Sequence, residues 1–202
     1  SPQLCAETET RMNWIAVVPL RQGSQPKSRL SCRLSPEQRV VLTMKMARIV
    51  IDALQTCEAI EQIVVLSPHP PADGLSASWR YDSGRGMNAE LDALREDLHD
   101  AAMLVILGDL PLVGPEDIDA MLAAAEQNGV ALAPDRHDEG TNAVAIAQGR
   151  AFNFAFGEGS LSRHKERTEG AMVVQRRGLS LDIDTPEDLD AAIEAGYRPQ
   201  LG

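Results

Sequence analysis

The pattern of apolar and polar positions along the chain predicts a protein in which strands and helices alternate. Short, uninterrupted apolar runs are typical of strands that are buried on both faces of a sheet. Such runs predict strands over residues 14–20, 63–66, 103–107, 130–133 and 140–146, and short strands over residues 79–81, 172–175 and 179–181.

Helices are expected between these strands. The sequence Ser35-Pro36-Glu37-Gln38 predicts a helix start, with a serine cap, proline in the first turn and glutamine three residues after the cap. Six apolar residues then recur at helical spacing and should pack against the rest of the fold: Val40, Val41, Met44, Ala47, Ile51 and Leu54. Further helices should begin with Asn88 as the N-cap, at Pro115, at Ser160, and at the capping box Thr185-Pro186-Glu187-Asp188.

This alternation predicts an α/β fold of one domain, in which a mostly parallel mixed sheet carries helices on both faces. A chain of 202 residues is long enough for one domain with a substantial core. We assign residues 12–202 to this domain. The polar residues 1–11, which precede Met12, are interpreted as a tag or a disordered extension outside the fold.

The composition argues against several classes of partner. The formal net charge is −11 and the chain has no basic run, which argues against a nucleic-acid-binding surface. The apolar runs are shorter than the roughly 18 residues of a membrane span, and no signal-peptide pattern is visible. Cys5, Cys32 and Cys57 show neither metal-binding spacing nor a disulfide framework. We therefore expect a cytoplasmic protein that binds neither membrane nor nucleic acid.

Acidic residues end two of the predicted extended segments. Asp109 follows an apolar run, at the carboxyl edge where open α/β sheets bind ligands, although a turn residue is the alternative for Asp109 alone. Asp182 and Asp184 alternate along an extended segment, so their side chains should point the same way. The helix cap that follows does not account for them. A few carboxylates completed by water and substrate phosphates suit Mg²⁺, and we expect these three residues to bind it.

Two other segments are candidates for anion binding. The polar loop of residues 21–30 carries three cations, as a phosphate cradle would, and a solvated loop is the alternative. With one glycine, it is neither a P-loop nor a dinucleotide-binding fingerprint. Near Ser160, two glycines precede a predicted helix whose free backbone N–H groups would bind an anion. A metal and cations around phosphates are typical of phosphoryl or nucleotidyl transfer.

Five motifs occur in the order in which they are found in the phospholactate guanylyltransferases, and the chain resembles this family from Met12 to about Ala195. These enzymes make the activated lactyl precursor of the deazaflavin coenzyme F-420. Gly-Asp-Leu-Pro is shared by many nucleotidyltransferases, whereas the combination of motifs is fairly specific. The motifs are Lys27-Ser28-Arg29-Leu30, Gly108-Asp109-Leu110-Pro111, Gly140-Thr141-Asn142-Ala143, Phe156-Gly157 with Ser160 and His164, and Asp182-Ile183-Asp184-Thr185-Pro186-Glu187-Asp188-Leu189.

The resemblance implies a three-layer fold like that of sugar-nucleotide pyrophosphorylases and molybdenum-cofactor guanylyltransferases. It implies GTP as the donor and a small phosphorylated acid as the acceptor: 2-phospho-L-lactate, phosphoenolpyruvate or 3-phospho-D-glycerate. An acceptor phosphate oxygen would attack the α-phosphorus while Mg²⁺ and Lys27 neutralise charge as pyrophosphate leaves. No general base is required, because the acceptor phosphate is already ionised near neutral pH.

The resemblance also implies roles for single residues. Lys27 and Asp109 would be catalytic, and Asp109, Asp182 and Asp184 would hold the metal. The nucleotide would be bound by Lys27, Arg29, Ser67 and Asn88, and the acceptor by Thr141, Asn142, Gly157 and Ser160. For His164, packing and acceptor contact are equal alternatives, and for Arg163 a solvated side chain is favoured over acceptor contact.

Two other functions remain open. One is another nucleotidyltransferase that acts on a sugar phosphate or on the molybdenum cofactor, although the glycine-rich first loop of the latter group is missing. The other is a non-catalytic nucleotide-binding module, against which the complete acid set argues. The acceptor, the number of metal ions and the oligomeric state, with a homodimer as one alternative, are also open. We expect the product to be handed over to the next biosynthetic transferase.

Overall fold

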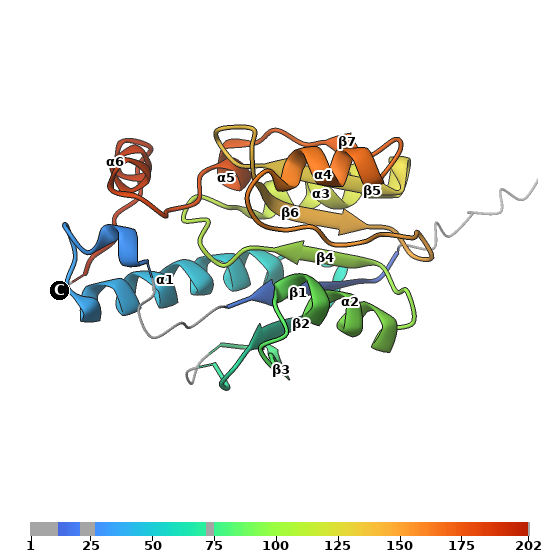
Figure 1. Cartoon of the computed structure of the whole chain (residues 1–202), viewed down its shortest axis with the longest axis horizontal. Coiled ribbons are helices and arrows are strands. Elements are labelled where there is room, and N and C mark those ends of the chain that lie inside the picture. The colour runs from blue at the N-terminus through green and yellow to red at the C-terminus, as the bar shows by residue number, and fades with distance from the viewer. Residues whose placement is uncertain (1–11, 21–26, 72–74, 202) are drawn as a thin grey trace, which may run out of the picture.

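A seven-stranded mixed sheet forms the middle layer of the fold in the computed structural model (Figure 1). The structure describes residues 12–20, 27–71 and 75–201, so the interpretation of residues 1–11 and part of the basic loop lie outside it. The strands are β1 (Trp14–Pro19), β2 (Ile60–Ser67), β3 (Ser78–Tyr81), β4 (Met103–Ile106), β5 (Val130–Pro134), β6 (Thr141–Ile146) and β7 (Met172–Val173).

The strand order is β3-β2-β1-β4-β6-β5-β7. β1 pairs in parallel with β2 and β4, β2 with β3, and β5 with β7, whereas β6 runs antiparallel to β4 and β5. The prediction of a mostly parallel mixed sheet is therefore confirmed. Because β6 is reversed, its first residues lie at the same edge of the sheet as the carboxyl ends of β1, β4 and β5.

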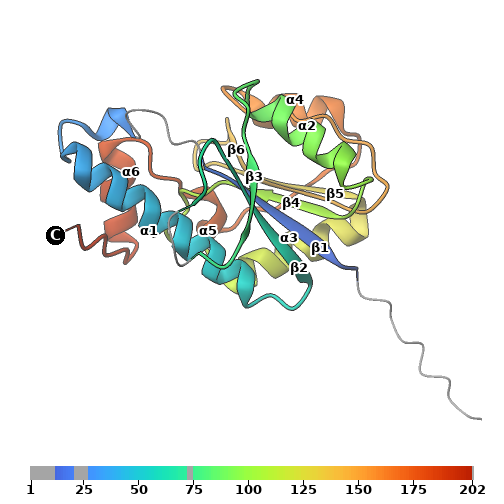
Figure 2. The same ribbon diagram turned by 90° about the horizontal axis from the view of Figure 1, so that it is seen from below.

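Helices cover both faces of the sheet, with α1 and α3 on one face and α2 and α4 on the other (Figure 2). A 3-10 turn, η1, follows β1, and the short α5 and the α6 helix lie near the carboxyl terminus. The helices are η1 (Ser28–Leu30), α1 (Pro36–Gln55), α2 (Met87–Asp97), α3 (Pro115–Asn128), α4 (Ser160–Arg167), α5 (Arg177–Ser180) and α6 (Pro186–Glu194).

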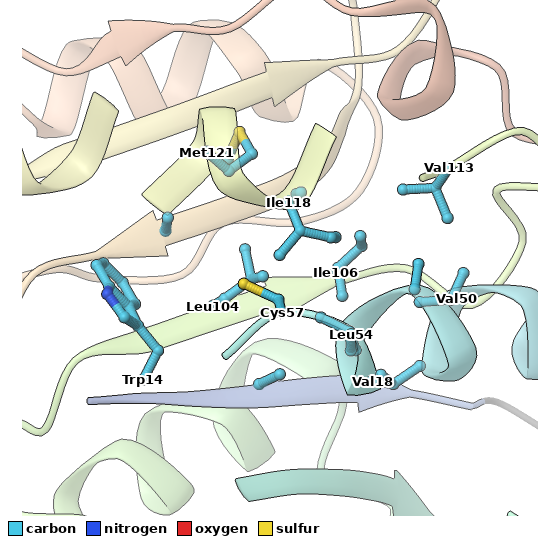
Figure 3. Close-up of a cluster of buried hydrophobic side chains, with 14 of the residues drawn as sticks. Trp14, Val18, Val50, Leu54, Cys57, Leu104, Ile106, Val113, Ile118 and Met121 are labelled. Atoms are coloured by element: carbon cyan, nitrogen blue, oxygen red, sulfur yellow. The ribbon is translucent and has the colours of Figure 1, made fainter. Parts of the chain in front are cut away.

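Two apolar layers sandwich the sheet, because successive side chains of a strand point to opposite faces. In β1, Trp14 and Val18 join Leu104 and Ile106 of β4 against α1 and α3 (Figure 3). On the other face, Val17 packs with residues of β4, α2 and α4. Each central strand is thus buried on both sides, as its uninterrupted apolar sequence predicts.

Local sequence signals set the ends of the long helices. Ser35 caps α1 in a capping box with Gln38. α3 begins at Pro115, and its C-cap is Gly129, which has the positive φ that glycine adopts readily. Thr185 caps α6 in a box with Asp188. The predicted starts of these helices are confirmed.

Two sequence predictions are wrong, one about packing and one about secondary structure. Val40 and Val41 are exposed, because the first turns of α1 extend beyond the sheet and contact the α6 region on their other side (Figure 1). The strand expected over residues 179–181 is instead the end of α5 and an extended segment. Leu179 and Leu181 pack into different clusters, and a short apolar run does not by itself distinguish a strand from a helical turn.

Within the described residues, none of the helices combines the length and the apolar character needed to cross a bilayer.

Candidate active site

Three carboxylates converge at the carboxyl edge of the sheet. Asp109 follows β4 after Leu107 and Gly108, and Asp182 and Asp184 lie on the extended segment between α5 and α6. One ligand atom from each of the three lies within 4.8 Å of the others. The predicted grouping of these acids is confirmed, although Asp109 and Asp182 lie 73 positions apart in the sequence.

Hydrogen bonds from three directions hold the segment that carries Asp182 and Asp184. The Asn142 amide of β6 donates to Asp182 Oδ1 at 3.0 Å. The backbone N–H of Ile183 donates to the Asp109 carbonyl at 3.2 Å. The backbone N–H of Asp184 donates to Asp188 Oδ2 at 3.1 Å, in the first turn of α6. The acids are therefore fixed relative to β4, β6 and α6.

Lys27 lies between two of the acids. Its Nζ is 2.6 Å from Asp109 Oδ2 and 2.6 Å from Asp184 Oδ1. Burial alone would lower the pKa of Lys27, but these two carboxylates outweigh burial and hold the pKa above its ordinary value. Lys27 also adopts left-handed backbone angles, φ 52° and ψ 46°, which a residue with a side chain rarely takes. The ammonium is thus a fixed positive charge inside the acid cluster.

Asp182 is a partly buried acid whose surroundings shift its pKa. Burial is the main cause that raises the pKa of Asp182 to about 6, and the neighbouring Asp109 and Asp184 raise it further against the opposing hydrogen bond from Asn142. A cation beside Asp182 would stabilise its ionised form, which burial and the neighbouring acids disfavour. The electrostatics therefore favour a positive charge beside Asp182.

A cavity of about 430 Å³ opens beside the acids. Its polar lining includes the predicted nucleotide-binding residues Lys27 and Arg29, together with Ser28 and Thr43. The full lining is Pro19, Leu20, Lys27, Ser28, Arg29, Thr43, Met87, Leu107, Gly108, Asp109 and Asp184. Two cations and two carboxylates thus share one concave surface, which suits an anionic ligand that carries a divalent metal.

The acid cluster fits a hard divalent cation on its own chemistry. Asp109 Oδ1 is buried and has no hydrogen-bond partner within the described part of the chain. A buried carboxylate oxygen without a partner is costly, and a metal ion would satisfy it. Asp109, Asp182 and Asp184 together supply the oxygen ligands that Mg²⁺ prefers.

The residues predicted to bind the acceptor form a buried hydrogen-bond network. The Ala155 N–H donates to His164 Nε2 at 2.9 Å, so the other ring nitrogen carries the proton and faces Thr141 Oγ1 at 3.0 Å. Ser160 Oγ also donates to Thr141 Oγ1, at 3.2 Å. Burial, and then the charges of two nearby arginines, lower the pKa of His164 to about 4. Of the two alternatives for His164, packing with a hydrogen bond is confirmed.

Two of the backbone donors predicted at the start of α4 are already used. The Ser160 N–H donates to the Gly157 carbonyl at 3.0 Å, and the Leu161 N–H donates to the Glu139 carbonyl at 3.1 Å. The expectation that these groups are free for an anion is therefore wrong. Gly157 and Gly159 do have positive φ angles, as a glycine-dependent turn requires. Arg163 binds the carbonyls of this same loop.

Two predicted nucleotide-binding residues lie outside the cavity lining. Ser67 is buried, and its hydroxyl donates to the His69 carbonyl at 2.7 Å. Asn88 binds both backbone groups of Phe156, at 2.8 and 3.1 Å, and is not the N-cap of α2, which is Gly86. The side chain of Asn88 therefore bonds to the loop before α4 and does not cap its own helix. The nucleotide-binding roles of both residues stay predictions.

The sequence analysis missed some residues around the site. Arg136 Nη2 lies 2.6 Å from Asp188 Oδ1, so a charge that follows β5 anchors the residue that holds Asp184. Its position after a predicted strand, like that of Asp109, was a signal that could have found it. Thr43 and Met87 line the cavity from α1 and α2. Neither carried a signal, because both occur within ordinary helical patterns.

Comparisons with known proteins agree with this geometry. Residues 14–197 match the family described as "Guanylyl transferase CofC like". The phosphoenolpyruvate guanylyltransferase of Sphaerobacter thermophilus is 39% identical over 201 residues, covering 93% of this chain and 95% of the relative. The protein of the same name from Rubrobacter xylanophilus is 36% identical over 207 residues, covering 94% and 99%.

A solved structure supports the fold. A protein from Desulfovibrio desulfuricans, described as a nucleotide-diphospho-sugar transferase, superposes with a TM-score of 0.67 at 14% identity, covering 91% of this chain and 87% of the other. The expected three-layer nucleotidyltransferase fold is confirmed by this likeness. The family match over nearly the whole chain and the similarity to the two relatives show that this chain belongs to the CofC-like guanylyl transferase family of nucleotidyltransferase enzymes.

Proposed function

We propose that the chain transfers the guanylyl group of GTP to phosphoenolpyruvate and releases pyrophosphate, as a step in coenzyme F-420 biosynthesis. The observation that carries the proposal is the convergence of Asp109, Asp182 and Asp184 beside a cavity that also presents Lys27 and Arg29. The relatives named phosphoenolpyruvate guanylyltransferase support the choice of acceptor. The resemblance to the F-420 enzymes supports GTP and the pathway.

Asp109, Asp182 and Asp184 would hold the metal, and Mg²⁺ is the ion that we propose. When bound, Mg²⁺ would neutralise phosphate charge and orient the attacking and leaving groups. The buried, unpartnered Oδ1 of Asp109 supports this assignment. Asn142 and Asp188 would keep Asp182 and Asp184 in place during the reaction, through the hydrogen bonds that hold the segment.

Lys27 and Arg29 would bind the triphosphate. Lys27 lines the cavity, and its ammonium is paired with two carboxylates, which leaves the third of its N–H donors for a phosphate oxygen. In the reaction, an acceptor phosphate oxygen forms a bond to the α-phosphorus. The bond to the bridging oxygen breaks, and its electron pair leaves with pyrophosphate. Lys27 would stabilise that developing charge, as preorganised cations do in such transfers.

The acceptor would bind near Thr141, Asn142, Gly157 and Ser160, as the resemblance implies. Hydrogen bonds join Thr141 to both Ser160 and His164. We therefore assign Thr141 and Ser160 the role of shaping the acceptor site. Gly157 lies on the exposed loop before α4 and would offer its backbone to the acceptor. The product would then pass to the next biosynthetic transferase.

The identity of the product tests the proposal. Purified protein would be incubated with Mg²⁺, with GTP, ATP or CTP, and with phosphoenolpyruvate, 2-phospho-L-lactate, 3-phospho-D-glycerate or a hexose 1-phosphate. Mass spectrometry would then identify any nucleotidyl adduct. We expect the guanylyl adduct of phosphoenolpyruvate, together with an equal amount of pyrophosphate.

Each other result has a definite meaning. An adduct of a sugar phosphate, or equal use of ATP and CTP, would show a nucleotidyltransferase of another specificity. Nucleotide binding without an adduct for any acceptor would show a binding module. An adduct of 2-phospho-L-lactate or 3-phospho-D-glycerate in preference to phosphoenolpyruvate would keep the guanylyl transfer and change the acceptor.

A further inference from the structure

Asn142 connects the strand end before Asp109 with the segment that carries Asp182. It is the second residue of β6 and only 3% of it is exposed. Its backbone carbonyl accepts the N–H of Leu107 at 2.9 Å, two residues before Asp109. The backbone of Asn142 is therefore fixed to the strand end that presents the first acid.

The side chain of Asn142 is surrounded by acceptors. Its Nδ2 lies 3.0 Å from the Leu179 carbonyl, 3.3 Å from the Ser180 carbonyl and 3.0 Å from Asp182 Oδ1. The backbone carbonyls of Leu179 and Ser180 can only accept hydrogen bonds, so the NH₂ end of the amide must face this side. The hydrogen-bond partners therefore determine which end of the amide is the nitrogen and which is the oxygen.

These contacts hold one of the two carboxylate oxygens of Asp182. The amide donates to Oδ1, which fixes the rotation of the carboxylate, and the carbonyls of Leu179 and Ser180 fix the amide in turn. Metal-binding groups are commonly oriented by such a second layer of hydrogen bonds, whose loss weakens metal binding by roughly 10–100-fold.

We propose that Asn142 is a positioning residue that orients Asp182 toward the metal, rather than a residue that binds the acceptor. This role rests on the metal site of the proposed function. It predicts that Asn142 controls the affinity for a divalent metal even when no nucleotide or acceptor is present. It also predicts that Asn142 has little effect on the Michaelis constant for phosphoenolpyruvate.

The test measures metal binding directly. Binding of Mn²⁺ to nucleotide-free protein would be followed by electron paramagnetic resonance for the wild type, Asn142→Ala and Asn142→Thr. Threonine suits a strand but is too short to reach Asp182. Asn128→Ala is the matched control. The Asn128 amide also donates to a backbone carbonyl, that of Ala124 at 2.9 Å, but Asn128 lies on α3. Thermal unfolding without metal would report the effect of each change on the fold.

We expect Mn²⁺ affinity to fall roughly 10–100-fold in both Asn142 variants and to stay unchanged in Asn128→Ala. In steady-state assays, the variants should need more Mg²⁺ but recover most of their turnover when the metal is saturating. Unchanged Mn²⁺ affinity in a folded Asn142 variant would overturn the role. So would a raised Michaelis constant for phosphoenolpyruvate with normal metal binding, or a wild type that binds no Mn²⁺.

Failure of the proposed function would look different. A wild type that binds Mn²⁺ but forms no guanylyl adduct would contradict guanylyl transfer, while the comparison of Mn²⁺ affinities would still decide the role of Asn142. If Asn142→Ala does not fold, Asn142→Thr provides the same comparison, because its β-branched side chain is favoured in a strand.

Discussion

At the scale of single residues, Lys27 determines the charge balance of the site. Its ammonium is 2.6 Å from a carboxylate oxygen of each of Asp109 and Asp184, two of the proposed metal-binding residues. A divalent cation at these carboxylates would face the charge of Lys27 at short range, and unit charges at such separations interact strongly. Lys27 and the metal should therefore compete for the acids until the phosphates of a nucleotide bind the lysine ammonium.

This competition predicts opposite effects of Lys27→Met on binding and on turnover. In nucleotide-free protein, Mn²⁺ should bind about tenfold or more tightly, because two of the carboxylates lose the ammonium that is paired with them. Turnover with GTP should fall about 100-fold or more, because no ammonium stabilises the leaving pyrophosphate. Calorimetry with Mn²⁺ and a pyrophosphate assay would measure the two effects.

Lys45→Met is the matched control for the loss of a positive charge. Lys45 lies on α1, and its ammonium donates to the carbonyl of Gln200 near the carboxyl terminus. It should change neither Mn²⁺ affinity nor turnover. Weaker Mn²⁺ binding in Lys27→Met than in the wild type would show that the lysine supports the metal site instead of competing with it.

At the scale of secondary structure elements, the start of α6 is part of the site. Asp188 Oδ2 closes the capping box with Thr185 and also accepts the N–H of Asp184. Arg136 holds the other oxygen of Asp188. The first turn of this helix therefore sets the position of one acid as well as ending an extended segment.

Two cap variants separate these roles. Thr185→Ala and Ser35→Ala each remove a side-chain cap, and each should lower the free energy of unfolding by about 1 kcal/mol. Thr185→Ala should also weaken Mn²⁺ binding several-fold, because Asp188 is then less firmly held against Asp184. Ser35→Ala, whose cap lies on α1, should leave Mn²⁺ binding unchanged. Equal Mn²⁺ affinities in both variants would contradict the link between α6 and the metal site.

The same elements show how far the sequence predicts the structure. Most strand positions and the caps at Ser35 and Thr185 were predictable, because they depend on residues a few positions apart. The pair of acid segments was predictable from strand ends and alternation. The bridge from Lys27 to Asp184 was not, because it joins residues 157 positions apart and requires a left-handed backbone at a lysine.

The buried network of the loop before α4 was also beyond sequence reasoning. A serine that begins a helix is expected to leave N–H groups for a ligand, yet Ser160 is 1% exposed and its hydroxyl bonds to Thr141 on β6. Three segments must pack together before His164 can accept from Ala155. Only the tertiary arrangement decides whether such polar side chains face a ligand or one another.

At the scale of the whole molecule, His164 should contribute to the pH dependence of stability. Burial lowers its pKa from 6.5 to about 4 in the folded protein, so the unfolded chain binds a proton first as the pH falls. The contribution is fully present above pH 6.5 and is lost as the pH falls from 6.5 to about 4. We expect a loss of about 3 kcal/mol over this interval.

Chemical unfolding at several pH values would measure this contribution. In His164→Gln, which cannot titrate, the decline between pH 6.5 and 4 should be shallower than in the wild type. His137→Gln changes an exposed histidine and should follow the wild-type slope. Equal slopes for all three proteins would mean that His164 titrates normally when folded.

The central claim is that the three acids at the carboxyl edge act through a metal to transfer a guanylyl group. Its most direct test is the rate of Mg²⁺-dependent adduct formation from GTP and phosphoenolpyruvate in Asp184→Asn. The control is Asp190→Asn, which removes an acid paired with Arg33 on the exposed side of α6. We predict a loss of at least about 100-fold in Asp184→Asn, since an uncharged amide is a weaker ligand for a hard cation, and a near wild-type rate in Asp190→Asn. Near wild-type turnover in a folded Asp184→Asn protein would contradict the account.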